Sequence, residues 1–225
     1  MKKTNKRTKL IITLIVLIAL IGILPIKEII MEPSIIGQTI ARVFVKGLET
    51  NHSCSAVFME GWNLISIPCL ATNTSPEFVL SSISGNYTSI HYYDLNNNTD
   101  HWKSYNPGLP SWVVNDLVYI NEKDGYWINM KNQSNFHLNG TLIQPNEVPL
   151  VKGWNLMGYP TDNSKEITNA LSTISGSYTI IWLYNASDSK YYYYNVSESN
   201  GTLQEMMPYY GYWVNMSKND SLFVI

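Results

Sequence analysis

The segment DLNNNTD, residues 94–100, is the best candidate for metal chemistry, because it places side-chain oxygens at alternate positions as calcium-binding loops do. The loop type needs a glycine where Thr99 stands, and a bidentate glutamate where Tyr105 stands. A hairpin turn explains the same letters, since Asn and Asp tolerate left-handed backbone conformations. We therefore expect no metal and no cofactor, and keep a weak calcium candidate. Its ligands would be Asp94, Asn96, Asn98 and Asp100.

Catalytic motifs are missing from the sequence. It contains no Gly-x-Ser-x-Gly, no His-Glu-x-x-His and no phosphate loop. Its acidic residues are scattered through polar segments, so no pair can be placed on a common face. We expect no enzyme, since an enzyme would need titratable groups that converge in a cleft.

Aromatic side chains are the candidates for ligand contact. Trp102, Trp112 and the run Tyr191, Tyr192, Tyr193 and Tyr194 lie in or beside predicted hairpins, where they can form a carbohydrate-stacking surface. The alternative is a strand with aromatic residues on both faces, one buried and one against a neighbouring unit.

Cys54 and Cys69 are the only cysteines, fifteen residues apart. A zinc site needs about four N or S ligands, and no His-Cys spacing supplies them. We expect a disulfide in an oxidising compartment.

The amino terminus predicts a membrane anchor. Five of the fifteen basic residues fall in residues 1–9, and residues 10–26 carry no charge. This length is at the lower edge of what spans a bilayer, and the basic cluster orients the amino terminus inside. Residues 10–26 thus read as an uncleaved signal anchor, with secretion after signal-peptide cleavage as the alternative. The rest of the chain is net acidic, which excludes a basic nucleic-acid footprint.

Asparagine usage also favours an extracytoplasmic location. Eleven Asn-x-Ser/Thr acceptor sequences follow the membrane segment. Turns rich in Asn and Ser produce some such sequences by chance, which raises this number. Nine of them are predicted glycosylation sites, whereas Asn215 lies inside a predicted strand and Asn219 follows closely. The nine are Asn51, Asn73, Asn86, Asn97, Asn132, Asn139, Asn185, Asn195 and Asn200.

An internal repeat organises the chain. GWNLISIP at 61–68 returns as GWNLMGYP at 153–160, and GYWINM at 125–130 returns as GYWVNM at 211–216. The offset between copies falls from 92 to 86 residues, as expected for deletions in turns between two copies of one fold. Tryptophans that recur most simply serve the core of each copy. They are Trp62, Trp154, Trp127 and Trp213.

Local signals predict a mainly β (α+β) fold of two tandem modules, each an antiparallel sheet or barrel-like unit with one short helix. Ser75 and Pro76 begin the first helix and Gly85 follows its end. We also predict a strand at 116–121 and a linker between the modules at 144–150. We expect Trp62 and Leu64 to pack beneath the helix. The predicted segments are a cytoplasmic terminus 1–9, an anchor 10–26, a stalk 27–56, and modules 57–145 and 146–225.

The two end motifs, with ISG at 83–85 and again at 174–176 between them, resemble the GWNL/GYW repeat modules found in tandem in archaeal, and some bacterial, secreted, cell-surface and S-layer-associated proteins. The resemblance covers residues 57–225 and implies an extracytoplasmic location with an envelope or adhesive role. It carries over no catalytic residues. We therefore expect a membrane-anchored, N-glycosylated protein with a structural or interaction role at the cell envelope. The alternative is an adhesin that binds glycans or proteins through exposed aromatics.

Overall fold

The structure, a computed structural model, describes residues 48–224 except residues 96, 98, 111 and 145. It is mainly β, with 50% of residues in strands and 8% helical, and its sheets are antiparallel, so the predicted class is confirmed at this level. The predicted terminus, anchor and most of the predicted stalk, residues 1–47, lie outside this part. Within it, no helix has the length and apolar character needed to cross a bilayer.

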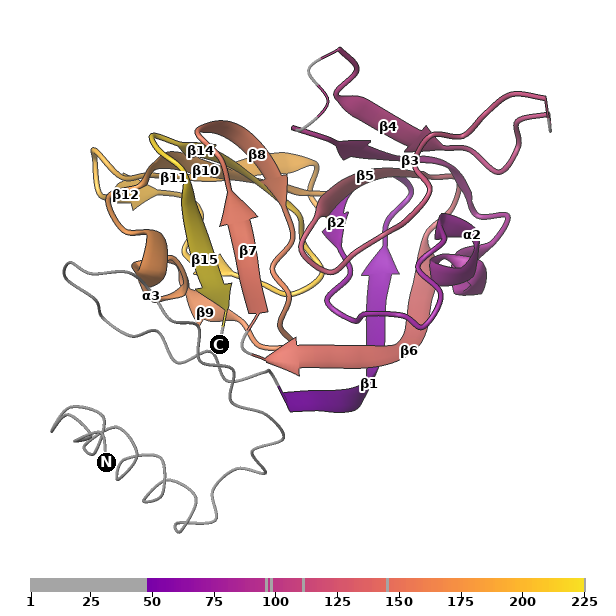
Figure 1. Cartoon of the computed structure of the whole chain (residues 1–225), viewed down its shortest axis with the longest axis horizontal. Coiled ribbons are helices and arrows are strands. Elements are labelled where there is room, and N and C mark those ends of the chain that lie inside the picture. The colour runs from indigo at the N-terminus through magenta and orange to yellow at the C-terminus, as the bar shows by residue number, and fades with distance from the viewer. Residues whose placement is uncertain (1–47, 96, 98, 111, 145, 225) are drawn as a thin grey trace, which may run out of the picture. The chain divides into compact units, whose positions relative to one another are not determined.

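The first half of the described chain contains two antiparallel sheets and a short helical segment (Figure 1). Strand β1 pairs along its whole length with β6, and the other strands form a sheet in the order β2-β5-β3-β4. The elements are β1 (Leu48–Phe58), β2 (Gly61–Ser66), α2 (Pro76–Val79), η1 (Ser81–Ile83), β3 (Tyr87–Tyr93), β4 (Trp102–Tyr105), β5 (Gly125–Met130) and β6 (Ser134–Gln144).

The second half has the same arrangement of matching segments. Strand β7 pairs with β15, and a sheet runs in the order β12-β11-β10-β14-β8. A small β9-β13 ladder is additional. The elements are β7 (Asn146–Leu150), β8 (Gly153–Met157), β9 (Lys165–Glu166), α3 (Ile167–Ala170), η2 (Ser172–Ile174), β10 (Tyr178–Asn185), β11 (Lys190–Asn195), β12 (Asn200–Gly201), β13 (Glu205–Met206), β14 (Tyr212–Met216) and β15 (Asp220–Val224).

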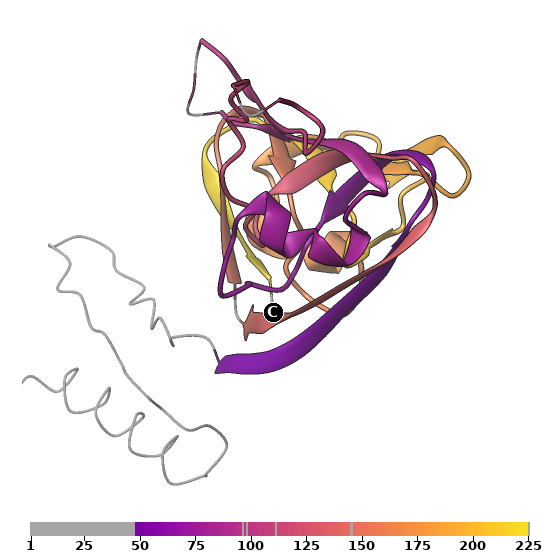
Figure 2. The same cartoon turned by 90° about the vertical axis from the view of Figure 1, so that its right-hand side faces the viewer.

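Each half encloses its own hydrophobic cluster beneath its helical segment. Ser75 caps α2 by accepting a hydrogen bond from the Phe78 amide, and Pro76 occupies the first turn, as the sequence predicts. The view turned by 90° shows α2 and η1 against the strands of the first half (Figure 2). The described residues all belong to one compact unit.

Two local predictions are wrong. Residues 116–121 form no strand, because Asp116 and Leu117 bond to the Ser104 carbonyl and Ile120 to Thr74 outside any ladder. The expected linker at 144–150 is instead largely β7, which completes the second half by pairing with β15. Residues 48–56, at the end of the predicted stalk, lie in β1.

The repeated GWN residues hold the chain in a hydrogen-bonded turn at the start of β2 and of β8. Gly61 and Gly153 have φ of 84° and 100°, a left-handed conformation that favours glycine. The buried Asn63 side chain accepts from the Met59 amide at 2.9 Å and donates to the Met59 carbonyl at 2.7 Å. Asn155 makes the same pair of bonds with Val151 at 2.9 and 2.7 Å. The motif therefore fixes how each edge strand enters its sheet.

The two halves contact each other reciprocally. The Ser66 amide donates to the Tyr209 carbonyl at 2.9 Å, and at the matching positions the Gly158 amide donates to the Lys123 carbonyl at 2.7 Å. Isolated bridges repeat the pattern, joining Ile65 to Tyr210 and Met157 to Asp124. Such mutual contacts are those of a two-fold interface, here within one chain.

Glycines make this close approach possible. A Cβ on Gly125 would lie 2.8 Å from the Met157 carbonyl oxygen, and a Cβ on Gly211 would lie 2.7 Å from that of Ile65. Leu64 is buried beside Gly211, against the second half and not beneath the helix as we expected. The glycine of each GYW motif therefore serves the contact between the halves.

Candidate functional site: an aromatic face

Alternation along the strands separates core residues from outward residues. In β5, Tyr126, Ile128 and Met130 are buried, so Trp127 points to the other face of the sheet. Strand β14 repeats this with Trp213 pointing outward. We call the outward rings of both sheets the aromatic face. It comprises Trp62, His91, Tyr93, Trp102, Trp127, Trp154, Trp182, Tyr184, Tyr191, Tyr193 and Trp213.

The prediction that the repeated tryptophans serve the cores is wrong. Trp62 is 45% exposed and Trp154 is 42% exposed, whereas the core side of β2 carries Ile65. Trp62 packs edge-on against Trp127 with ring centroids 6.3 Å apart, and Trp154 packs in the same way on Trp213 at 6.4 Å. The repeat therefore preserves an outward pair of rings in each half.

Rings also cross from one half to the other. Trp127 of the first half lies 5.4 Å from Tyr184 of the second, and Trp213 lies 5.2 Å from Tyr93, which occupies the position matching Tyr184. The aromatic face is thus shared by both sheets and follows the reciprocal backbone contacts.

Five of these rings line an open hollow of about 510 Å³. Three tryptophans come from three adjacent strands, since Trp154 on β8, Trp213 on β14 and Trp182 on β10 lie on neighbouring backbones. Tyr93 and Tyr191 complete the lining. No charged side chain is among the lining residues. We refer to this cavity as the hollow and to these five side chains as its lining residues.

The aromatic residues predicted as ligand contacts divide into three groups. Trp102 lies on the aromatic face with its ring centroid 6.2 Å from that of Trp213, but it does not line the hollow, whereas Tyr191 does. Tyr193 packs on Trp182 at 5.1 Å. Tyr192 and Tyr194 pack instead against the core of the second half, because they alternate with Tyr191 and Tyr193. Trp112 is 80% exposed in the loop after β4 and is not among the residues of the hollow.

Sequence reasoning missed Tyr93, Trp154, Trp182 and Trp213 as site residues. The signal available in the sequence was the alternation along the strand. Trp213 lies on the opposite face of the strand from the apolar residues Tyr212, Val214 and Met216. Either of the two alternating sets of side chains on a strand can face the core. Which set does so depends on the segments that pack against the sheet, and the sequence does not identify those segments.

His91 takes the place in the first half that Trp182 takes in the second. It lies opposite Trp127 in the ladder, as Trp182 lies opposite Trp213. Burial lowers the pKa of His91, with an opposing effect of Asp116, and its Nε2 lies 2.9 Å from the Ser89 hydroxyl. The imidazole is therefore mainly neutral at pH 7 and continues the uncharged face.

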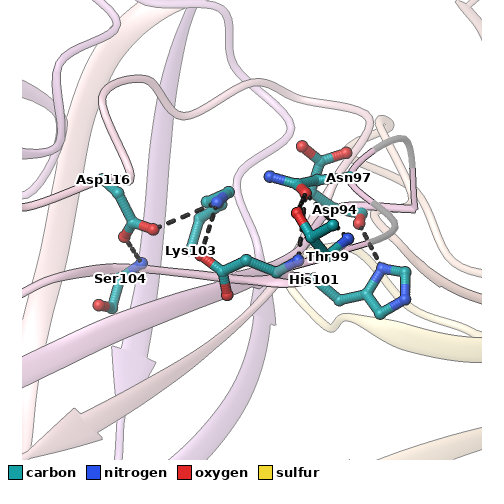
Figure 3. Close-up of polar contacts among 8 residues, drawn as sticks. Asp94, Asn97, Thr99, His101, Lys103, Ser104 and Asp116 are labelled. Carbon is teal, nitrogen blue, oxygen red and sulfur yellow. Dashed lines mark hydrogen bonds and ion pairs between the residues drawn. The ribbon is translucent and has the colours of Figure 1, made fainter.

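The calcium candidate is built as a turn (Figure 3). Asn97 Oδ1 accepts bonds from the amides of Thr99 and Asp100 at 3.2 and 3.1 Å. The Asp94 carbonyl lies 3.0 Å from His101 Nδ1, and the Asp100 carboxylate pairs with Lys103 at 2.9 Å. Lys103 also pairs with Asp116 at 3.3 Å. Asn96 and Asn98 lie outside the described residues. These contacts are those of a hairpin turn in which the Lys103 ammonium group pairs with the carboxylate of Asp100.

Cys54 and Cys69 form a disulfide with Cα atoms 6.2 Å apart. The bond links β1 to the segment after β2, which also bridges to β6 through Leu70 and Thr141. His52 lies within 4.8 Å of both sulfurs, but the sulfurs are covalently joined and offer no thiolate. The second half has no cysteine to match this bridge.

None of the eleven acceptor asparagines is buried, whereas the buried asparagines, Asn63, Asn146 and Asn155, all lack an acceptor sequence. In three hairpins the acceptor hydroxyl bonds back to its asparagine. Thr99 Oγ1 donates to Asn97 Oδ1 at 3.0 Å, Ser187 Oγ to Asn185 Oδ1 at 2.8 Å, and Ser197 Oγ to Asn195 Oδ1 at 2.9 Å.

Within the described part of the chain, the carboxyl group with the most perturbed pKa is that of Asp124, which is not among the residues of the hollow. Burial raises the pKa of Asp124 to about 7, although hydrogen bonds from Asn121 and Tyr126 oppose the shift. Its side chain accepts from Asn121 Nδ2 at 2.6 Å, and its backbone bridges to Met157 in the second half. The group therefore belongs to the contact between the halves.

No protein-family model matches the chain, and neither the curated proteins nor the solved structures contain a significant match.

Proposed function

We propose that this chain is an N-terminally anchored, N-glycosylated protein of the cell exterior whose two GWNL/GYW modules bind carbohydrate through the aromatic face. The observation that carries the binding role is the hollow, five aromatic side chains from both halves around an opening without charged groups. A pyranose ring presents a face of C–H groups that packs on aromatic rings, while its hydroxyls stay in contact with water.

A carbohydrate fits this surface better than other ligands. Nucleic acid requires cations along its backbone, and the chain after residue 9 is net acidic. A quaternary ammonium group would be favoured by an enclosing cage, whereas this hollow is open. We assign no catalytic residue to the protein.

Two copies of one module account for the sequence repeat, the matching strand orders and the reciprocal contacts. The basic cluster before residues 10–26 supports an outward orientation of these modules, and the accessible acceptor asparagines support glycosylation. Protease added to intact cells should remove residues beyond about 30, and full protection would contradict this orientation.

The binding role is tested by retention on insoluble cellulose, chitin and starch and on polysaccharide purified from the source cell envelope. We expect retention on at least one of these, loss of retention in Trp154→Ala and Trp182→Ala, and no change in Trp112→Ala. Trp112 is the matched control because it is the more exposed ring but lies outside the hollow. Equal loss in all three variants, or no retention on any polysaccharide, would refute carbohydrate binding at the hollow.

A further inference from the structure

Asn215 is an acceptor asparagine of the aromatic face, and it lies on the strand that carries Trp213 of the hollow. It follows Trp213 by two residues on β14, so both side chains point to the same side of the sheet. Its neighbours Val214 and Met216 are buried in the core, whereas Asn215 is partly exposed. The acceptor sequence is completed by Ser217, which is exposed just after the strand.

The register places Asn215 next to two rings of the hollow. Asn215 is paired directly with Trp154 on β8. Side chains directly opposite each other in a ladder have Cβ atoms about 5 Å apart, and residues two apart on a strand are separated by about 7 Å. Trp154 and Trp213 are therefore both within reach of the first sugar attached to the Asn215 amide.

We infer that Asn215 carries an N-linked glycan whose first sugar packs on Trp154 and Trp213, so that glycosylation at this position covers the hollow. This inference rests on the glycosylation and carbohydrate-binding parts of the proposed function. The same ring chemistry that would bind an external glycan would bind a tethered one more readily, since the attachment converts binding into an intramolecular event. Occupancy of Asn215 then regulates access to the hollow.

The first half supplies a natural control. Asn129 matches Asn215 and is paired with Trp62 in the same way, but Lys131 stands where Ser217 completes the acceptor sequence. The two residues make the same backbone bond, since the Lys131 amide donates to Asn86 at 2.7 Å and the Ser217 amide to Ser177 at 2.8 Å. Exchange of these side chains therefore changes the acceptor sequence with little change in the fold.

The test uses the full chain produced in its source cells, with glycopeptide mass mapping and site-resolved oxidation of tryptophan by N-bromosuccinimide. We expect a glycan on Asn215, loss of that glycan in Ser217→Lys, and gain of one on Asn129 in Lys131→Ser. We expect Trp154 and Trp213 to be oxidised at least about threefold more slowly in the wild type than in Ser217→Lys, from the area that a stacked sugar removes from solvent. Trp112 should react equally in both.

Three outcomes would overturn the inference, and they are distinguishable. Glycans on other asparagines with an unmodified Asn215 would refute this site and leave the proposed glycoprotein intact. A glycan on Asn215 with equal oxidation rates would refute the covering of the hollow. No glycan on any asparagine would refute the glycosylation part of the proposed function together with the inference.

Discussion

In the second half, Trp182 on β10 lies directly opposite Trp213 on β14, whereas in the first half the position opposite Trp127 is His91. The backbone positions around these residues are the same in both halves, down to the paired turns and the tyrosine buried in each GYW motif. The repeated letters therefore maintain the backbone arrangement and an outward pair of tryptophans in each half. The neighbouring outward positions are free to differ, and they give the second half the larger aromatic surface.

The largest expected effect concerns the disulfide, which only the first half contains. Replacement of Cys54 and Cys69 by alanine should lower the free energy of unfolding by about 3 kcal/mol, as expected for a closed loop of this length. Urea denaturation measures the loss, and amide exchange locates it. We expect faster exchange in β1 and β2 than in β7 and β8, so equal acceleration in both halves would show that the bridge supports the whole unit.

The glycines at the contact between the halves should come next. Gly125→Ala and Gly211→Ala each force a Cβ against a carbonyl oxygen of the other half, and each should cost about 2 kcal/mol of stability. The control is Gly108→Ala, where the nearest atom is Asn106 Oδ1 at 3.3 Å. Thermal denaturation of the three variants decides the matter. Similar losses at the first two positions are required by reciprocal contacts, and a loss at only one would break the comparison.

Asp124, at the contact between the halves, makes the stability of the protein depend on pH. Tyr210, at the matching position of the second half, does not have this effect. The folded protein holds the Asp124 proton up to a pKa of about 7, against 3.8 when unfolded, so stability falls as pH rises through this range. Asp124→Asn removes this dependence and should be more stable than the wild type at pH 8 by about 1–2 kcal/mol. Denaturation at pH 4 and pH 8 measures it, with Tyr210→Phe as the control. An unchanged pH profile in Asp124→Asn would contradict the assignment.

The smallest effect is expected from exchanging the differing rings. Trp182→His should weaken binding of a retained polysaccharide fragment about fivefold, and His91→Trp should strengthen it by a similar factor, from the roughly 1 kcal/mol of one aromatic contact. Fluorescence titration of both variants measures the change. Equal affinities in both would mean that this position does not distinguish the halves.

The sequence predicted the mainly β class, most of the strands and the helix start at Ser75, because these follow from local letters and their spacing. It did not predict which way Trp62 faces, since Leu64 shares its face and is as apolar as Ile65 on the other. Leu64 is buried where it lies beside Gly211 of the second half. The aromatic face therefore depends on packing between distant segments, which alternation along one strand does not reveal.

The carbohydrate role is tested most directly by the indole N–H signals of the seven tryptophans, followed by NMR as cellohexaose, chitohexaose or maltohexaose is added. We predict that at least one of these sugars shifts the signals of Trp154, Trp182 and Trp213, with smaller shifts for Trp62 and Trp127. The Trp112 signal should remain unchanged. Shifts confined to Trp112, or an unchanged spectrum with all three sugars and with fragments of the source envelope polysaccharide, would contradict it.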